Sequence, residues 1–229
     1  MKEVTVTTLQ FDIERLPIET PTLDIHALPE TPHVVPGAFG DRVAYALCKA
    51  MRFGADLFFR KRYLHRSVVL ETVAAVPGLV GAALQHLRSL RVMRGRADLV
   101  RILMEESENE RMHLMAFVAL CRPSLLERLL VLLVQGMFFN GFFLLYLVSP
   151  AVAHRLVGYF EEEAVVSYTR FLEQIEAGAI ANVEIPEFAR DYWKLGAGAR
   201  LRELVIAVRA DEAHHRDVNH QLALIERSR

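Results

Sequence analysis

The pattern Glu-x-x-His occurs three times in this chain, and two of the three copies lie in long stretches with helical periodicity. Those two copies are Glu110 with His113 and Glu212 with His215. On a helix, residues three apart lie on one face about one turn apart, close enough to bind the same metal ion. The third copy is interrupted by Pro32, so Glu30 and His33 cannot share a helical face and are set aside. A single copy is more often part of a solvated helical face, but two helical copies favour a fold that brings two helices together around one metal site.

The distribution of prolines and the helical periodicity of the rest of the chain predict an all-α protein. Five of the nine prolines fall in residues 1–40, which predicts an extended N-terminal arm followed by a single helical domain over residues 41–229. No run shows the alternation of a strand bounded by hairpin turns. The expected helices span 41–62, 66–93, 97–121, 124–147, 151–177 and 199–226, with a break over 178–198.

Composition excludes several classes of protein. Hydrophobic residues make up 52% of the 229 positions, which is too many for a disordered linker. The formal net charge of -1 does not suit a basic nucleic-acid binder, so we expect no nucleic-acid partner. Cys48 and Cys121 are the only cysteines and do not make a disulfide framework.

A metal site built from these motifs needs further carboxylates. In ferritin-like four-helix bundles, two helices with Glu-x-x-His and one glutamate from each of two other helices hold a pair of iron or manganese ions. Glu71 is the first candidate, because no other charged residue occurs from position 67 to 85. A carboxylate in so apolar a helix must be protonated, paired or bound to metal. A simple ion pair with Arg66 is the alternative.

The second candidate comes from three consecutive glutamates. The apolar stripe of the helix over 151–177 passes through Ala164 and Tyr168, and Glu161 falls on that side, whereas Glu162 and Glu163 rotate away from it. Tyr168 lies two turns further along the same face, near the proposed metals. The complete ligand set is Glu71, Glu110, His113, Glu161, Glu212 and His215. Carboxylates with two imidazoles suit iron or manganese better than zinc.

Four blocks of sequence resemble the signatures of the alternative oxidase family. They are LETVAAVPG (70–78), NERMHL (109–114), EEEA (161–164) and RADEAHHRDVNH (209–220), and the resemblance runs in order from about Asp41 to His220. The resemblance implies a membrane-bound, non-haem di-iron enzyme that passes electrons from ubiquinol to dioxygen, makes water, resists cyanide and pumps no protons. The blocks resemble mitochondrial and bacterial members rather than plastid ones. Because the first ten residues lack a signal or transit pattern, we expect a bacterial member or a trimmed mature chain.

The resemblance also implies roles for individual residues. The six glutamates and histidines match the ligands of two iron ions, and Tyr168 matches a tyrosine that takes part in the redox step. The quinol pocket would be lined by Arg66, Leu70, His154, Glu163 and Ala164. The side chains that orient the ligands would be Asn109, Asp211, Tyr192 and Trp193. Glu163 or Glu71 is placed to help remove the quinol proton.

Residues 129–148 carry no charge and are long enough to span a membrane. If they did, Glu110 and Glu161 would lie on opposite sides of about 30 Å of hydrocarbon, whereas paired metal ions lie about 4 Å apart. We therefore expect a monotopic protein, bound to the bacterial inner membrane at its cytoplasmic face or to the mitochondrial inner membrane at its matrix face. The basic residues expected to face lipid are Lys49, Arg52, Arg60, Lys61, Arg62 and Arg66.

The partners expected from this interpretation are ubiquinol, dioxygen, a lipid surface and, by family analogy, a second copy in a homodimer. Thiol-linked control is not expected, because residues 1–47 contain no cysteine. A di-iron hydroxylase acting on a membrane quinone or lipid is the alternative, since its ligands would be nearly identical. An iron-storage protein is a third hypothesis, but residues 129–148 are too apolar for a soluble cage.

Overall fold

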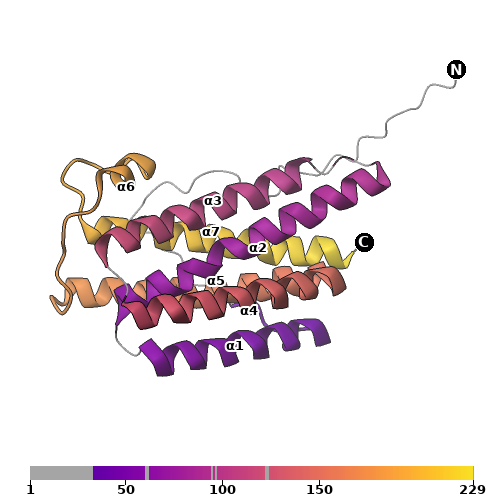
Figure 1. The fold of residues 1–229 in the computed structure, drawn as a ribbon, viewed down its shortest axis with the longest axis horizontal. Helices are drawn as coiled ribbons and strands as arrows, with labels where there is room; N and C mark the ends of the chain where they lie inside the picture. The colour runs from indigo at the N-terminus through magenta and orange to yellow at the C-terminus, as the bar shows by residue number, and fades with distance from the viewer. Residues whose placement is uncertain (1–32, 60–61, 94, 96, 122–123, 229) are drawn as a thin grey trace, which may run out of the picture.

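The fold is given by a computed structural model, which describes residues 33–59, 62–93, 95, 97–121 and 124–228. Within this part of the chain there are seven helices and no strand (Figure 1). The helices are α1 (Phe39–Phe59), α2 (Tyr63–Val92), α3 (Ala97–Leu120), α4 (Leu125–Val148), α5 (Pro150–Glu176), α6 (Glu187–Tyr192) and α7 (Leu201–Arg227). The all-α prediction is confirmed.

Four helices form the bundle, and two others lie on its outside. The most extensive contacts join α5 to α7 and α2 to α3. Helix α4 packs on α2 and α5, and α1 packs mainly on α5, along the edge of the molecule opposite α3 (Figure 1). The largest apolar core lies between α3, α5 and α7, where Phe117, Phe171 and Leu204 are almost fully buried. This arrangement leaves α2, α3, α5 and α7 to enclose a site between them.

The expected helix boundaries agree with the structure to within a few residues, with one omission. Helix α6 lies inside the stretch 178–198 that was expected to be irregular. Its six residues begin directly after Pro186 and are too few to show a helical period. Of the predicted extended arm, residues 1–32 lie outside the described residues, and residues 33–38 contain no helix.

Helices α2 and α4 are both long and apolar enough to cross a membrane, but they differ in burial. Half or more of the apolar window of α2 is buried in the bundle, whereas only 11% of that of α4 is buried. Length and composition alone are weak evidence for a span. The exposed apolar side chains of α4 are Leu125, Leu126, Leu129, Leu132, Leu133, Met137, Phe139, Leu144, Leu147 and Val148.

The basic residues expected to face lipid do not form one surface. Arg52 of α1 and Arg66 of α2 turn inward and form ion pairs. Lys49 and Arg62 remain about half exposed. Arg60 and Lys61 lie outside the described residues. The exposed positive charge available to a lipid surface is therefore smaller than the sequence suggests.

Candidate metal centre

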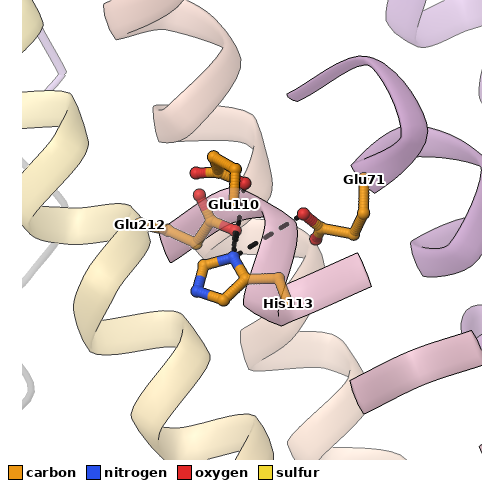
Figure 2. A group of neighbouring side chains, drawn as sticks. All are labelled: Glu71, Glu110, His113 and Glu212. Atoms are coloured by element: carbon orange, nitrogen blue, oxygen red, sulfur yellow. Dashed lines mark ion pairs between the residues drawn. The ribbon is translucent and has the colours of Figure 1, made fainter. Parts of the chain in front are cut away.

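Four buried acidic and basic side chains meet in the middle of the bundle. Glu71 comes from α2, Glu110 and His113 from α3, and Glu212 from α7, and one potential ligand atom of each lies within 4.8 Å of the others. Figure 2 shows the three carboxylates gathered around one edge of the His113 ring. The two members on α3 share a face because they are three residues apart.

Nδ1 of His113 faces all three carboxylates. It lies 3.3 Å from Glu110, 3.4 Å from Glu212 and 3.6 Å from Glu71. Among the described residues, this nitrogen has no hydrogen-bond partner. Oε2 of Glu71 and both carboxylate oxygens of Glu110 likewise make no hydrogen bond of good geometry within the described part of the chain, although His113 and His215 lie within ion-pair distance of them. Buried polar atoms are nearly always satisfied in folded proteins, so these converging atoms fit a centre that binds a cation.

The other two predicted ligands lie beside this cluster. Nδ1 of His215 is 2.7 Å from Oε1 of Glu110. Glu161 is buried, and besides burial the nearby carboxylate of Glu212 raises its pKa well above the ordinary value. All six side chains proposed as ligands are thus brought together from α2, α3, α5 and α7.

The neighbours of Glu161 point elsewhere, as the helical register predicts. Glu162 accepts hydrogen bonds from the backbone of Val34 and, at 2.9 Å, from His220. Glu163 forms ion pairs with Lys49 and Arg52 of α1. Of the three consecutive glutamates, only Glu161 lies against the cluster.

The cluster holds more carboxylates than its two imidazoles can neutralise. Burial and the neighbouring Glu110 and Glu212 raise the pKa of Glu71 to about 8. Burial opposes ionisation of Glu110 as well, yet His113 and His215 hold its pKa below the ordinary value. In the absence of metal, protons must therefore balance part of the charge. Divalent cations would take the place of these protons.

A second layer of polar side chains fixes the orientation of His113. Nε2 of His113 lies 3.2 Å from Oδ2 of Asp211, which also accepts hydrogen bonds from Trp193 at 2.7 Å and from Asn109 at 3.0 Å. Asn109 in turn donates to the hydroxyl of Tyr192 at 3.2 Å. These are the four side chains expected to orient the ligands, and the structure brings them together. Such partners set the tautomer and basicity of a metal-binding histidine.

A cavity of about 470 Å³ lies between the cluster and helices α1 and α4. Glu71, Glu161, Glu212 and Tyr168 line one part of it, and the rest is mostly apolar. Four of the five predicted pocket residues line this cavity: Arg66, Leu70, Glu163 and Ala164. Its volume suits a small organic molecule.

His154 is the predicted pocket residue that the structure places elsewhere. It hydrogen-bonds to Tyr146 and to Asn219, both at 3.0 Å. His154 shares a helical face with Glu161 but lies two turns before it, about 10 Å along the helix axis. The family resemblance implies a place in the pocket for His154, but His154 is not among the described residues that line this cavity.

Tyr168 joins the cavity to the cluster. It is buried, it stacks on Phe117 at 5.7 Å, and its hydroxyl donates a hydrogen bond to Oε1 of Glu71. Burial and the adjacent Glu71 raise the pKa of this hydroxyl well above its ordinary value. Arg66, the alternative partner considered for Glu71, pairs with Asp56 instead.

Sequence reasoning missed a buried carboxylate next to the cluster. Glu106 lies one turn before Glu110 on α3, and both of its oxygens accept from Asn219 at 3.0 Å. Asn219 lies one turn after His215 on α7 and also donates to its backbone carbonyl at 3.0 Å. Burial raises the pKa of Glu106 to about 7. The sequence does contain a signal for this pair, because Glu106 lies four residues before Glu110 and Asn219 lies four residues after His215.

Comparison with known proteins assigns a family. The alternative oxidase family matches residues 26–224. The chain is 53% identical over 207 residues to a mitochondrial ubiquinol oxidase of Batrachochytrium dendrobatidis, a match that covers 90% of this chain and 66% of that protein. It is 57% identical over 190 residues to the mitochondrial ubiquinol oxidase 2 of Glycine max, covering 83% and 57%. It therefore spans little more than half to about two thirds of the length of these relatives.

Proposed function

Because the chain belongs to the alternative oxidase family, we propose that it is a quinol:oxygen oxidoreductase that oxidises ubiquinol. Two quinols would each give up two electrons and two protons, and one dioxygen would take up all four of each to form two waters. The observation that carries this proposal is the convergence of four glutamates and two histidines beside a cavity that reaches the apolar outer helices. The names of the similar proteins, which are ubiquinol oxidases, support the choice of substrate.

The proposed cofactor is a pair of iron ions. The residues that would hold it are Glu71, Glu110, His113, Glu161, Glu212 and His215. When bound, two irons would supply the binding of dioxygen and the storage of electrons that carboxylates and imidazoles cannot provide. The protein would supply the fixed ligand geometry, through contacts such as that between His113 and Asp211.

Tyr168 and Glu163 are the proposed participants from the protein on the cavity side. The hydroxyl of Tyr168 lies on the cavity wall and holds its proton against Oε1 of Glu71, so it lies between a molecule in the cavity and the metal ligands. Glu163 lines the same cavity, where it forms ion pairs with Lys49 and Arg52 of α1, and it is the proposed acceptor for a quinol proton. His154 does not line the cavity, so any role that it has in the pocket is proposed to be indirect, through its hydrogen bonds with Tyr146 and Asn219.

The proposed location is a membrane surface, without a transmembrane span. The broad apolar surface of α4 is exposed, and α1 exposes Phe53, Leu57 and Phe58 beside it. The site is built from helices that precede α4 in the sequence and helices that follow it. A membrane-spanning α4 would place these helices on opposite sides of the bilayer, so we propose that α4 lies along the bilayer surface. The mitochondrial names of the relatives support an inner mitochondrial membrane, with the matrix face proposed. A homodimer and a bacterial inner membrane remain proposals from the family resemblance.

The proposal is tested by the products of turnover. The iron-loaded protein in detergent or vesicles should consume oxygen with a ubiquinol in the presence of cyanide and return the quinone with no inserted oxygen. Recovery of a hydroxylated quinone or lipid would support the hydroxylase hypothesis instead. Absence of quinol-driven uptake by protein that holds iron would contradict the proposed activity.

A further inference from the structure

Buried polar side chains from five helices form one hydrogen-bonded chain that ends beside the candidate metal centre. Nε2 of Gln85 in α2 donates to the hydroxyl of Tyr146 in α4 at 3.0 Å, and this hydroxyl lies 3.0 Å from Nε2 of His154 in α5. Nδ1 of His154 lies 3.0 Å from Oδ1 of Asn219 in α7. Nδ2 of Asn219 lies 3.0 Å from both carboxylate oxygens of Glu106 in α3. All of these side chains are buried.

The chemistry of its members fixes the direction of each hydrogen bond in this chain. Nδ2 of Asn219 also lies 3.0 Å from the backbone carbonyl of His215, and a carbonyl only accepts, so this end of the amide is the donor. Oδ1 of Asn219 therefore accepts from Nδ1 of His154. Burial lowers the pKa of His154, which favours a neutral ring whose Nε2 accepts from the hydroxyl of Tyr146. Every donor in the chain thus points towards Glu106, and successive hydrogen bonds of one direction strengthen one another.

The two Glu-x-x-His motifs are not supported in the same way. The residue directly before the second motif is Asp211, and its carboxylate lies 3.2 Å from the ring of His113 in the first motif. The equivalent residue before the first motif is Asn109, which donates to Asp211 and has no charge to offer His215. Glu106 lies three residues before Asn109 on the same helix, and it is a buried carboxylate whose charge acts on His215. It therefore supplies a negative charge on the side of the site that Asn109 leaves neutral.

We propose that Glu106 is a buried anion that favours the oxidised form of the metal centre, and that Asn219, His154 and Tyr146 are positioning residues that hold it as the anion. His215 pairs with Glu110 rather than with Glu106, so Glu106 acts through its charge and not as a ligand. A nearby anion attracts a more highly charged metal ion more strongly. A chain of donors that ends on a carboxylate favours its ionised form against the effect of burial. The inference rests on the proposed pair of iron ions and adds a residue that tunes them without binding them.

The first experiment compares the affinities of the parent and of Glu106→Gln for ferric and for ferrous iron, each measured by competition with a chelator, the ferrous form without oxygen. The substitution keeps the shape of the side chain and removes its charge. Ferric affinity should fall about tenfold more than ferrous affinity, because the attraction to an anion grows with the charge of the metal. A structural disturbance alone would weaken both by the same factor. An unchanged ratio of the two affinities would overturn the proposal.

Two control variants separate the charge of Glu106 from its place in the fold. Glu105→Gln removes the same charge from the neighbouring position, where the side chain is 58% exposed and solvent screens it, so the ratio of ferric to ferrous affinity should match that of the parent. Glu106→Asp keeps the charge, so its ratio should stay within about threefold of that of the parent. A change in Glu106→Asp as large as that in Glu106→Gln would overturn the role of the charge.

Tyr146→Phe tests the positioning residues and serves as the probe should Glu106→Gln fail to fold. It removes the donor to Nε2 of His154, so the direction of the chain is no longer fixed. The ratio of ferric to ferrous affinity should fall about threefold, and by less than about twofold in a Glu106→Gln background, because the effect passes through Glu106. A parental ratio in Tyr146→Phe, or full losses that multiply, would overturn the positioning role. Iron binding is measured without quinol, so this inference and the proposed oxidase activity can fail separately.

Discussion

Nε2 of His113 lies 3.2 Å from Oδ2 of Asp211, while Nδ1 of the same ring faces the carboxylate cluster. A histidine that donates its Nε2 proton to a carboxylate has the Nδ1 lone pair free for a metal ion. Burial opposes ionisation of Asp211, yet His113 and Trp193 lower its pKa, so it is held as the anion that this arrangement needs. The contact links the chemistry of the site to α7 and to the loop that carries α6.

Replacing Asp211 should weaken metal binding without dismantling the cluster. We expect Asp211→Asn to lower iron affinity about 10- to 100-fold, because the ring of His113 loses its charged partner. The measurement is iron retained per chain during competition with a chelator. Asp217→Asn is the matched control, since Asp217 lies on the same helix with its side chain 48% exposed. Equal iron retention in both variants would contradict the orienting role.

Removing the hydroxyl of Tyr168 should affect turnover rather than metal loading. Tyr168→Phe keeps the stacking on Phe117 and loses the hydrogen bond to Glu71. We expect kcat to fall at least about tenfold while iron content stays at the parent level. Tyr159→Phe is the control, because the Tyr159 hydroxyl is buried and has no hydrogen-bond partner among the described residues. A kcat for Tyr168→Phe equal to that of this control would exclude a role in the redox step.

The metal-free protein should become less stable as the pH rises. Burial raises the pKa of Glu106 from 4.5 to about 7. A group whose pKa is raised in the folded state stabilises the folded protein fully at pH values below its unfolded-state pKa. This stabilisation is lost as the pH rises through its folded-state pKa. Glu71, with its pKa raised to about 8, acts in the same direction. Glu110, whose pKa is lowered, acts in the opposite one and loses its contribution in acid.

Thermal unfolding of the metal-free protein between about pH 5 and pH 8 tests this effect. The melting temperature of the parent should fall over that range, and that of Glu106→Gln should fall less. If Glu106 ionised freely in the folded protein, the melting temperatures of the parent and of Glu106→Gln would change equally with pH. A melting temperature that rises with pH would contradict the assigned directions.

The close approach of α2 and α3 depends on Gly78. A Cβ at this position would lie 2.2 Å from Oγ of Ser107 and 2.4 Å from the backbone oxygen of Leu103. We expect Gly78→Ala to lower the free energy of unfolding by about 2 kcal/mol or more, because the two helices must move apart. Gly136→Ala in α4 is the control, with nothing within 4 Å of its added Cβ. That change should stabilise the protein by about 0.5–1 kcal/mol, measured by chemical denaturation.

The helices and the cluster could be predicted from the sequence because both depend on local spacing. The i, i+3 spacing placed Glu110 beside His113 and Glu212 beside His215, and the register of α5 separated Glu161 from Glu162 and Glu163. Each of these predictions needs only the period of a single helix.

What could not be predicted depends on how helices sit relative to one another. The pairing of Arg52 with Glu163 joins α1 to α5, and no spacing within one helix encodes it. The family resemblance placed His154 in the cavity, whereas the packing of α5 against α7 places it beside Asn219, outside the cavity lining. Helix α6 was missed because six residues do not complete two helical turns.

The most direct test of the account is the iron content of the purified protein. The parent should hold two irons per chain, and Glu110→Ala should lose them, because Glu110 contacts both histidines of the cluster. Glu108→Ala, an exposed position two residues away on the same helix, should keep both irons. Iron retained at the parent level in Glu110→Ala would contradict the assignment of the metal centre.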